Sequence, residues 1–382
     1  MEASKVFFTD MRCGLGISLL DKMDKLMLAA GIEQINFQNA FVAIKLHFGE
    51  PGNLAFLRPN FAKSVADRVK KLGGRPFLTD SNTLYVGRRN NALVHLDAAY
   101  ENGFNPLSTG CQIIIADGVK GTDDIEVPIN GGIQLQSARI GRAIMDADIF
   151  ISLSHFKGHE MTGFGGAIKN IGMGSGSRAG KMAMHCNGKP VVDQEKCVGC
   201  RICSKYCNQE AIHYLINKKA TIDHELCVGC GRCIGTCNYD AIASPIDGSH
   251  DDVNLRMVEY SKAVLDGRPH FHISVVNNVS PCCDCHGEND AAIIPDIGIF
   301  ASFDPVALDK ACIDAVNAAP VMRNTVLSDT LAQAEGDGCA SQGTKDHFRT
   351  VHPSTNWRSQ ISHAESIGLG SGNYELVTIT IK

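Results

Sequence analysis

The sequence predicts an α/β fold with a largely parallel sheet and flanking helices, plus a smaller inserted α+β domain. The chain has 382 residues, of which 44% are apolar, so it is long enough for two or three domains with sizeable cores. Short apolar runs alternate with amphipathic stretches along most of it, a pattern typical of βαβ units. A dense cysteine repeat interrupts this alternation and indicates the insertion.

The predicted strands are short apolar or β-branched runs bounded by turn residues: residues 41–46, 76–79, 112–116 and 148–153 before the insertion, and residues 271–276 and 293–300 after it. Apolar residues at three- and four-residue spacing predict amphipathic helices over residues 60–72, 93–102 and 136–146. A later helix, residues 305–318, is expected because Asp304 and Pro305 suit an N-cap and a first turn. In such folds the functional loops usually follow the carboxyl ends of the strands.

Composition and charge exclude several classes of protein. The formal net charge is −5, whereas a general nucleic-acid binder is usually basic, so we expect no nucleic-acid partner. The longest apolar stretches, such as residues 113–116 and 149–153, fall far below the roughly 20 residues that cross a bilayer, so we expect no membrane insertion. Residues 1–16 lack the apolar block and cleavage site of a secretory signal, which predicts a cytoplasmic protein. The sequence leaves the oligomeric state open.

The cysteines indicate metal or redox chemistry, because a reducing compartment does not keep thiols for disulfides. Eight of the 16 cysteines lie between positions 197 and 237, in the spacing C-x-x-C-x-x-C-x-x-x-C, twice. The repeat period is 30 residues and extends beyond the cysteines, since Glu195-Lys-Cys-Val-Gly-Cys200 aligns with Glu225-Leu-Cys-Val-Gly-Cys230. A duplicated unit is the plain interpretation.

This spacing predicts two 4Fe-4S clusters. Three thiolates two residues apart can hold three irons of one cluster, while the fourth cysteine of each run reaches the other cluster. The predicted ligands are Cys197, Cys200, Cys203 and Cys237 for cluster one, and Cys227, Cys230, Cys233 and Cys207 for cluster two. Zinc is the alternative, but zinc sites use pairs of ligands with longer gaps. Clusters of this kind favour an anaerobic or low-oxygen setting.

Residues 190–245 resemble a bacterial two-cluster ferredoxin in this cysteine pattern. The resemblance implies an inserted α+β ferredoxin-like domain with a role in electron transfer. We therefore divide the chain into residues 1–188 and 246–382, the two parts of the α/β domain, and residues 189–245, the insertion.

A glycine-rich loop after the strand predicted at residues 148–153 is the main candidate site outside the cysteine repeat. It runs from Ser154 to Gly174, with two histidines and two lysines among its glycines. Such a loop suits binding of a small anionic substrate or a proton-transfer step, although the glycines could serve turns and the histidines could be structural. The candidate catalytic residues are His155, Lys157, His159 and Lys169, with Lys45 and His47 at the end of another predicted strand.

Motifs across nearly the whole chain are similar to those of the domain of unknown function 362 family. They are Ala43-Ile-Lys-Leu-His-Phe-Gly-Glu50, Asp80-Ser-Asn-Thr-Leu-Tyr85, the block from His155 to Gly174, Cys283-Asp-Cys285 and Asp304-Pro-Val-Ala-Leu-Asp309. The resemblance implies 4Fe-4S binding with electron transfer, and it adds Asp80 and His95 as candidate site residues. A shorter stretch, from His155 to Gly174, is similar to nickel-dependent lactate racemases. This resemblance implies proton abstraction or metal-dependent chemistry with Lys169, His155 and His159 as the candidate residues.

A second cysteine group, Cys282-Cys-Asp-Cys-His286, formally matches the c-type haem attachment motif. We reject haem, because such attachment normally belongs to exported proteins. The group predicts instead a possible third metal or redox centre at Cys283 and Cys285, helped by Cys282, His286 or the His185-Cys186 pair. Packed thiols are the alternative. The sequence also leaves room for a flavin, because flavin sites often lack a short motif.

Three functions fit these observations. The first is an iron–sulfur oxidoreductase, in which two clusters exchange electrons with a substrate site on the α/β domain. The second is an electron carrier, in which the α/β domain docks a redox partner protein. The third is a proton-transfer or metal-dependent enzyme with structural clusters. The cationic loop favours the first, because a pure carrier has no use for such a pocket.

Overall fold

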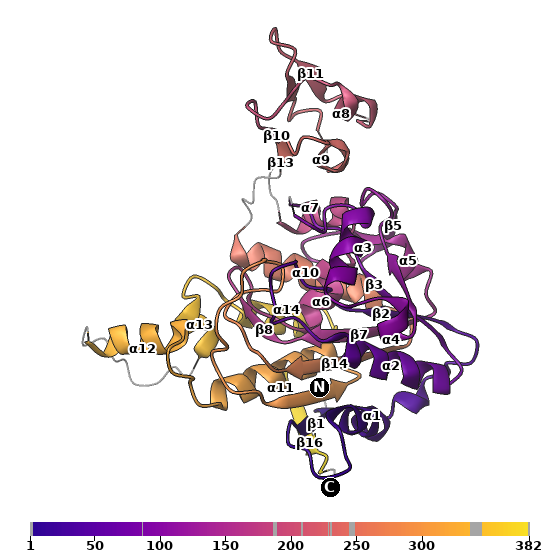
Figure 1. Cartoon of the computed structure of the whole chain (residues 1–382). Coiled ribbons are helices and arrows are strands. Elements are labelled where there is room, and N and C mark those ends of the chain that lie inside the picture. The colour runs from indigo at the N-terminus through magenta and orange to yellow at the C-terminus, as the bar shows by residue number, and fades with distance from the viewer. Residues whose placement is uncertain are drawn as a thin grey trace.

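The computed structural model describes residues 3–85, 87–185, 189–207, 209–227, 229, 231–243, 249–336 and 346–380. In this part of the chain, eight strands form one sheet in the order β16-β1-β15-β14-β7-β2-β3-β4 (Figure 1). Their bounds are β1 (Ser4–Asp10), β2 (Phe41–Lys45), β3 (Arg75–Asp80), β4 (Gln112–Ile115), β7 (Ile149–His155), β14 (His270–Val276), β15 (Gly298–Ser302) and β16 (Tyr374–Thr378). Strands β14, β7, β2, β3 and β4 run parallel, and β15 is antiparallel to both of its neighbours. The predicted α/β class with a largely parallel sheet is confirmed.

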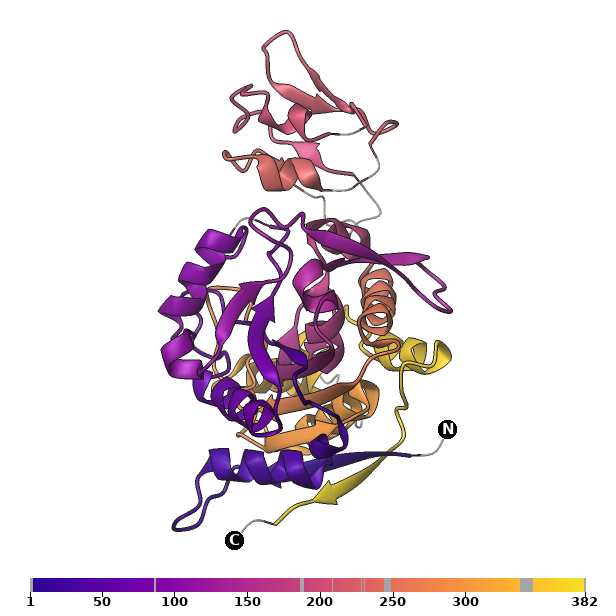
Figure 2. The same cartoon turned by 90° about the vertical axis from the view of Figure 1, so that its right-hand side faces the viewer.

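Helices cover both faces of the sheet, as Figure 2 shows. On one face lie α1 (Leu19–Ala29), α2 (Pro59–Lys71) and α3 (Ala92–Glu101); on the other lie α6 (Ala167–Ser175), α10 (His250–Leu265), α11 (Pro305–Ala318) and α14 (Arg358–Ser366). Alternate strand residues supply the two cores, because successive side chains point to opposite faces. Val42 and Ile44 pack under the first group of helices, whereas Ala43 packs under the second.

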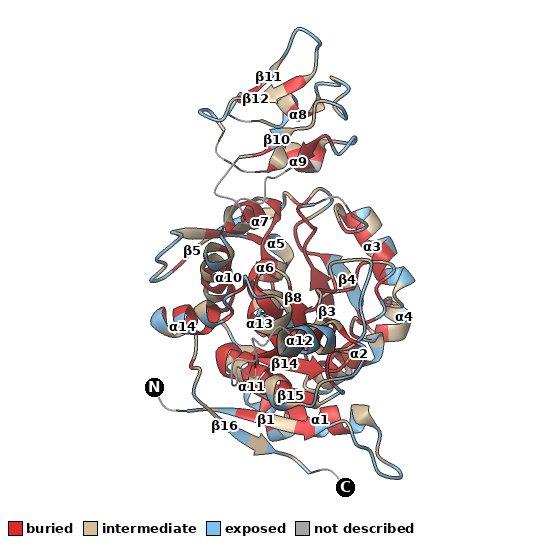
Figure 3. Cartoon of the chain, turned by 90° about the vertical axis from the view of Figure 1, so that its left-hand side faces the viewer, coloured by how far each residue is buried: buried red, intermediate tan, exposed pale blue. Residues whose placement is uncertain are grey.

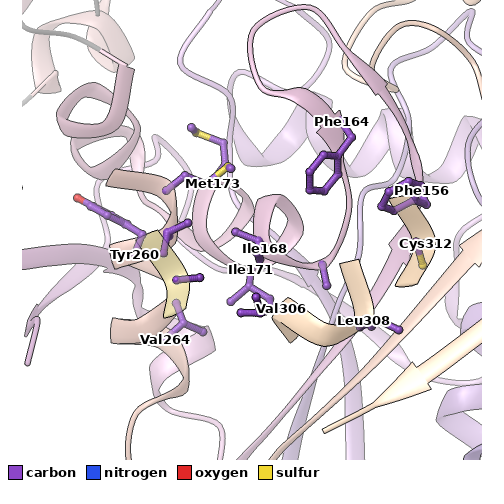
Figure 4. Packing of buried hydrophobic residues seen from close by; sticks show 14 of the residues in the cluster. Phe156, Phe164, Ile168, Ile171, Met173, Tyr260, Val264, Val306, Leu308 and Cys312 are labelled. Carbon is purple, nitrogen blue, oxygen red and sulfur yellow. The ribbon is translucent and has the colours of Figure 1, made fainter. Parts of the chain in front are cut away.

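The core under α6 fixes the helix that carries Lys169. Figure 4 shows Ile168 and Ile171 of α6 packed among Val264 of α10 and Val306 of α11. The N-terminus of α6 is held by Asp309 of α11, whose carboxylate accepts the backbone N–H groups of residues 167 and 168 at 2.7 and 2.9 Å. Burial raises the pKa of Asp309 to about 7. These apolar side chains are almost wholly shielded from solvent, as the burial colours of Figure 3 indicate for α6 and α11.

Residues 189–243 form a small separate lobe at one end of the molecule, beyond α7 (Arg178–His185) (Figures 1 and 2). It contains β10 (Val191–Val192) paired with β13 (Ile242–Ala243), and β11 (Ile212–Tyr214) paired with β12 (Ala220–Ile222). Two short helices, α8 (Ile202–Lys205) and α9 (Arg232–Thr236), complete it. The predicted domain boundaries, after residues 188 and 245, fall outside the described residues. Strands from both sides of this lobe share the large sheet.

Several predicted elements are confirmed and three are wrong. The segment from Ser154 to Gly174, expected as a loop, forms the end of β7, the paired strands β8 (Lys157–His159) and β9 (Gly163–Gly165), and most of α6. Helix α11 spans Pro305–Ala318 as expected, and the Asp304 side chain caps it by accepting two backbone N–H groups. The helix predicted over residues 136–146 is instead β6 (Ser137–Gly141), paired with β5 (Asp124–Pro128), followed by the short α5 (Arg142–Met145). Ala138 and Ile140 are buried while residue 139 is exposed, so the alternation of a strand decides this segment.

The strand predicted over residues 293–300 begins only at Gly298, because Ile293 and Ile294 are buried within an irregular segment. The edge strands β1 and β16 were not predicted. The remaining helices of the described residues include α4 (Pro106–Thr109), α12 (Val326–Gly336) and α13 (His347–Val351). None of the helices in the described ranges combines the length and the apolar character needed to cross a membrane.

Candidate functional site

A cavity of about 930 Å³ lies beyond the carboxyl ends of the central strands, with walls from both the α/β domain and the 189–243 lobe. All six predicted catalytic residues line it: Lys45, His47, His155, Lys157, His159 and Lys169. The lobe contributes Cys237 and Asp240. The parallel register explains the convergence, because β2, β7 and β3 end at the same edge of the sheet.

Lys45 and Asp80 form a buried ion pair at the floor of this cavity. Their Nζ and Oδ1 atoms are 2.8 Å apart, and both side chains are at most 4% exposed. Lys45 Nζ also donates to Asn170 Oδ1 at 3.0 Å. Burial lowers the pKa of Lys45, and the charge of Asp80 opposes this effect. Burial acts to raise the pKa of Asp80, but its cationic surroundings, above all the charge of Lys45, hold that pKa below its usual range.

His95, the other residue implied by family resemblance, lies behind Asp80 with its Nε2 atom 3.7 Å from Asp80 Oδ2. Burial lowers the pKa of His95 to about 3, so its imidazole is neutral at ordinary pH. His47 is held by Arg89, whose Nη1 atom lies 2.8 Å from His47 Nε2. Arg89 in turn donates to Glu50 Oε2 at 2.7 Å.

His155 is a positioning residue in this arrangement. Its Nε2 atom donates to the carbonyl of Asn277 at 2.7 Å, and its Nδ1 atom faces both oxygens of Asp284 at 2.9 Å. Both ring nitrogens are therefore engaged. Lys157 approaches the same carboxylate at 3.3 Å. Burial acts to raise the pKa of Asp284, but the charges of His155 and Lys157 hold it below its usual range.

The residues predicted for the third centre, Cys283 and Cys285, line the same cavity. Lys169 Nζ is 3.5 Å from Cys283 Sγ. One ligand-type atom from each of His159, Cys283 and Cys285 lies within 4.8 Å of the others. The hydrogen bond from Cys285 and the charge of Lys169 outweigh burial and lower the pKa of Cys283 well below that of an ordinary thiol.

Of the other residues expected to help this centre, His286 lies beside it. Its Nε2 atom is 3.0 Å from Glu160 Oε1, and one ligand-type atom from each of Glu160, Cys285 and His286 lies within 4.8 Å of the others. Cys282 belongs to neither ligand-type group found among the described residues. His185 lines the cavity, and burial lowers its pKa to about 3; Cys186 lies outside the described residues.

Two further cations line the cavity that sequence reasoning missed. Lys181 donates to the carbonyl of Gly176 at 2.6 Å, and Arg178 donates to the carbonyl of Asn90. Neither forms an ion pair in the described part of the chain, and Lys169 is bound to a sulfur rather than to a carboxylate. Burial lowers the pKa of Lys181 to about 8. A buried cation without a carboxylate partner favours an anionic ligand.

The cysteines of the lobe gather around two smaller cavities. One is lined by Cys197, Cys200, Cys203 and Cys237, and the other by Cys207, Cys227 and Cys233; Cys230 lies outside the described residues. Backbone N–H groups point at these sulfurs: Ala220 at Cys197 (3.3 Å), Ala211 at Cys207 (3.4 Å), Gly229 at Cys227 (3.4 Å) and Ala241 at Cys237 (3.3 Å). Such N–H groups stabilise thiolates, and the donor set suits 4Fe-4S clusters.

Comparison with known proteins gives a family match and distant likenesses. The profile of the family described as Domain of unknown function (DUF362) matches residues 42–314. A thylakoid-associated protein, sll1697 of Synechocystis sp., is 29% identical over 124 residues. That alignment covers 32% of this chain and 34% of the relative, so the chain spans about a third of the relative's length.

Two solved structures are similar over larger spans at low identity. The lactate racemase apoprotein from Thermoanaerobacterium thermosaccharolyticum is 11% identical with a TM-score of 0.40, covering 98% of this chain and 83% of that protein. A structural-genomics target from Thermotoga maritima is 10% identical with a TM-score of 0.38, covering 78% of this chain and 58% of that one.

Proposed function

Since the chain belongs to the family described as Domain of unknown function (DUF362), whose description gives no reaction, we propose from its own residues that it is an iron–sulfur oxidoreductase. In this proposal the lobe holds two 4Fe-4S clusters, which supply one-electron transfer when bound. The cavity of the α/β domain binds a small anionic substrate. One observation carries the proposal: Cys237, an expected cluster ligand, lines the same cavity as Lys169 and His159.

The charges of the cavity support an anionic substrate. Lys45, Lys157 and Arg89 are each matched by a carboxylate within 3.3 Å. Lys169, Lys181 and Arg178 have no carboxylate so close in the described residues, and all three line the cavity. A carboxylate or phosphate beside Lys181 and Arg178 would gain two cations without displacing an ion pair among the described contacts.

The residues of the cavity divide into two roles. Lys169, Lys181 and Arg178 hold negative charge, and His155 positions Asp284, which in turn holds Lys157. His159 is the candidate for proton exchange. Its Nδ1 atom accepts the backbone N–H groups of residues 161 and 162 at 3.0 and 3.2 Å, so its proton sits on Nε2, which lies 3.7 Å from Glu160 Oε1.

Reoxidation of the reduced protein tests this proposal. The anaerobically prepared, cluster-loaded protein is reduced, freed of excess reductant and mixed with a panel of small carboxylates and phosphate esters, while cluster absorbance is followed. We expect at least one compound to reoxidise the wild type, and the double variant His159→Ala with Lys169→Ala to keep its clusters but lose this reaction. If only redox proteins reoxidise it, and the double variant reacts as fast as the wild type, the chain is an electron carrier and the proposal is wrong.

A further inference from the structure

Resting on the proposed function, we infer that Cys283 and Cys285 form a redox-active dithiol that stores two electrons at the substrate cavity. The two sulfurs lie within 4.8 Å of each other and both line the cavity that Cys237 also lines. Neither residue lies in a helix or strand, so no regular hydrogen-bond ladder opposes the small movement that brings the sulfurs to the bonding distance of about 2.05 Å.

The surroundings of Cys283 are those of a stabilised thiolate. Lys169 Nζ lies 3.5 Å from the sulfur, and ligand-type atoms of His159 and Cys285 lie within 4.8 Å of it. Lys169 comes from α6, whose position is fixed by the core and by Asp309. The cation beside this sulfur makes Cys283 the attacking thiolate, and Cys285 is its partner thiol.

The hydrogen bonds of His159 argue against a metal ion at this group. A metal would need the lone pair of His159 Nε2. Because His159 Nδ1 already accepts two backbone N–H groups, at 3.0 and 3.2 Å, the ring proton is on Nε2, and this nitrogen has a proton to donate and no free lone pair. His159 is therefore suited to stabilise a thiolate rather than to bind a metal.

The redox step of the two cysteines needs an oxidised substrate as electron acceptor and a one-electron donor. On oxidation, the Cys283 thiolate and the Cys285 thiol form one S–S bond and lose two electrons and one proton to an oxidised substrate in the cavity. On reduction, the S–S bond takes two electrons, which two 4Fe-4S clusters held by the cysteines of the lobe would supply one at a time. One proton returns to Cys285, and Cys283 remains a thiolate held by Lys169. The pair thus joins one-electron donors to a two-electron reaction.

Thiol trapping tests the pair directly. Full-length, cluster-loaded protein is equilibrated anaerobically with several ratios of oxidised to reduced dithiothreitol, alkylated, digested and analysed by mass spectrometry. At oxidising ratios we expect Cys283 and Cys285 to escape alkylation, and their peptide to be lighter by two hydrogens. Cys285→Ser should leave Cys283 alkylated at every ratio. The control Cys282→Ser, next to the pair but outside it, should behave as the wild type.

Two results would overturn the inference. One is full alkylation of both thiols at every ratio. The other is a stoichiometric metal ion that is retained in Cys282→Ser and lost in Cys285→Ser, which would make the group a metal site. Failure of the proposed function is distinguishable, because absence of clusters would show in iron analysis while the disulfide could still be trapped. With clusters present, reductive titration of the wild type should consume two more electrons per chain than Cys285→Ser.

Discussion

Lys169 Nζ lies 3.5 Å from Cys283 Sγ, which joins the helix after the glycine-rich loop to the Cys283-Asp-Cys285 segment, 114 residues further along the chain. Among the described contacts, no carboxylate lies so close to Lys169, and no other lysine or arginine lies so close to Cys283. The contact makes the lysine a stabiliser of a thiolate, and it places the two motifs that the sequence shows separately within one site.

Removing this lysine should make Cys283 a weaker nucleophile at neutral pH. The hydrogen bond from Cys285 and the charge of Lys169 lower the pKa of Cys283, so alkylation of the reduced wild type should reach its plateau below the pH of about 8.5 typical of a thiol. In Lys169→Met we expect the midpoint pH of Cys283 alkylation to rise by at least about one pH unit. The rate of iodoacetamide labelling of the Cys283 peptide, followed from pH 5 to 10, measures this midpoint. The exposed Lys63→Met serves as control, and an unchanged midpoint in Lys169→Met would count against the assigned contact.

The buried pair of Lys45 and Asp80 should matter far more for stability than an exposed pair. Lys45→Ala leaves the Asp80 carboxylate buried without its cation, which should reduce the free energy of unfolding by about 3–5 kcal/mol. The combined change Lys45→Met with Asp80→Asn should cost less, because no charge is then left unpaired. Lys63→Ala, which breaks an exposed pair with Asp67, should cost about 0.5 kcal/mol or less. Urea denaturation measures all three, and similar losses for Lys45→Ala and Lys63→Ala would contradict the burial.

Asp309 should make the protein less stable as the pH rises. Burial raises its pKa to about 7, from about 4 in an unfolded chain, so the protonated form is favoured on folding. The contribution of Asp309 to the free energy of unfolding is fully present below pH 4 and is lost as the pH rises through about 7. The total loss is about 4 kcal/mol. Asp309→Asn should remove this part of the pH dependence. The difference between the two unfolding curves from pH 4 to 8 checks it, and parallel curves would refute the prediction.

The cluster ligands should fall into two crossed sets. Cys197→Ala and Cys237→Ala should disturb the same cluster, because both residues line one cavity, whereas Cys207→Ala and Cys227→Ala should disturb the other. EPR spectra of the reduced variants show which cluster signal survives. Identical residual spectra for Cys197→Ala and Cys207→Ala would mean that each cysteine run binds its own cluster. Cys111→Ser, in a buried thiol of the α/β domain, is the matched control.

Much of the fold could be predicted, because apolar periodicity is a local property of the sequence. Helix α11 and its Asp304 cap follow from two adjacent residues. The β5–β6 hairpin was missed because residues 136–146 carry apolar positions compatible with either period, and only pairing with β5 selects the strand. The edge strand β16 pairs with β1 across almost the full length of the chain, a contact that no local pattern reports.

The candidate site was predictable in its members but not in their roles. The six predicted residues share one cavity because β2 and β7 end at one edge of the sheet, and the segment that carries Lys157, His159 and Lys169 follows β7 directly. That His155 is saturated by Asp284 and a backbone carbonyl depends on a partner 129 residues away, so its residue type alone could not show it. Asp284 lies between Cys283 and Cys285, and Arg89 follows the motif from Asp80 to Tyr85, so their positions in the sequence did signal site residues. Lys181 and Arg178 carry no signal of their own.

Metal content decides whether the lobe holds two 4Fe-4S clusters beside the cavity. Protein purified and reconstituted without oxygen is analysed for iron, sulfide and other metals, and its reduced form is examined by EPR. We expect about eight irons and eight sulfides per chain, with two magnetically coupled cluster signals. Zinc in place of iron, or a chain that binds no iron after reconstitution, would contradict it.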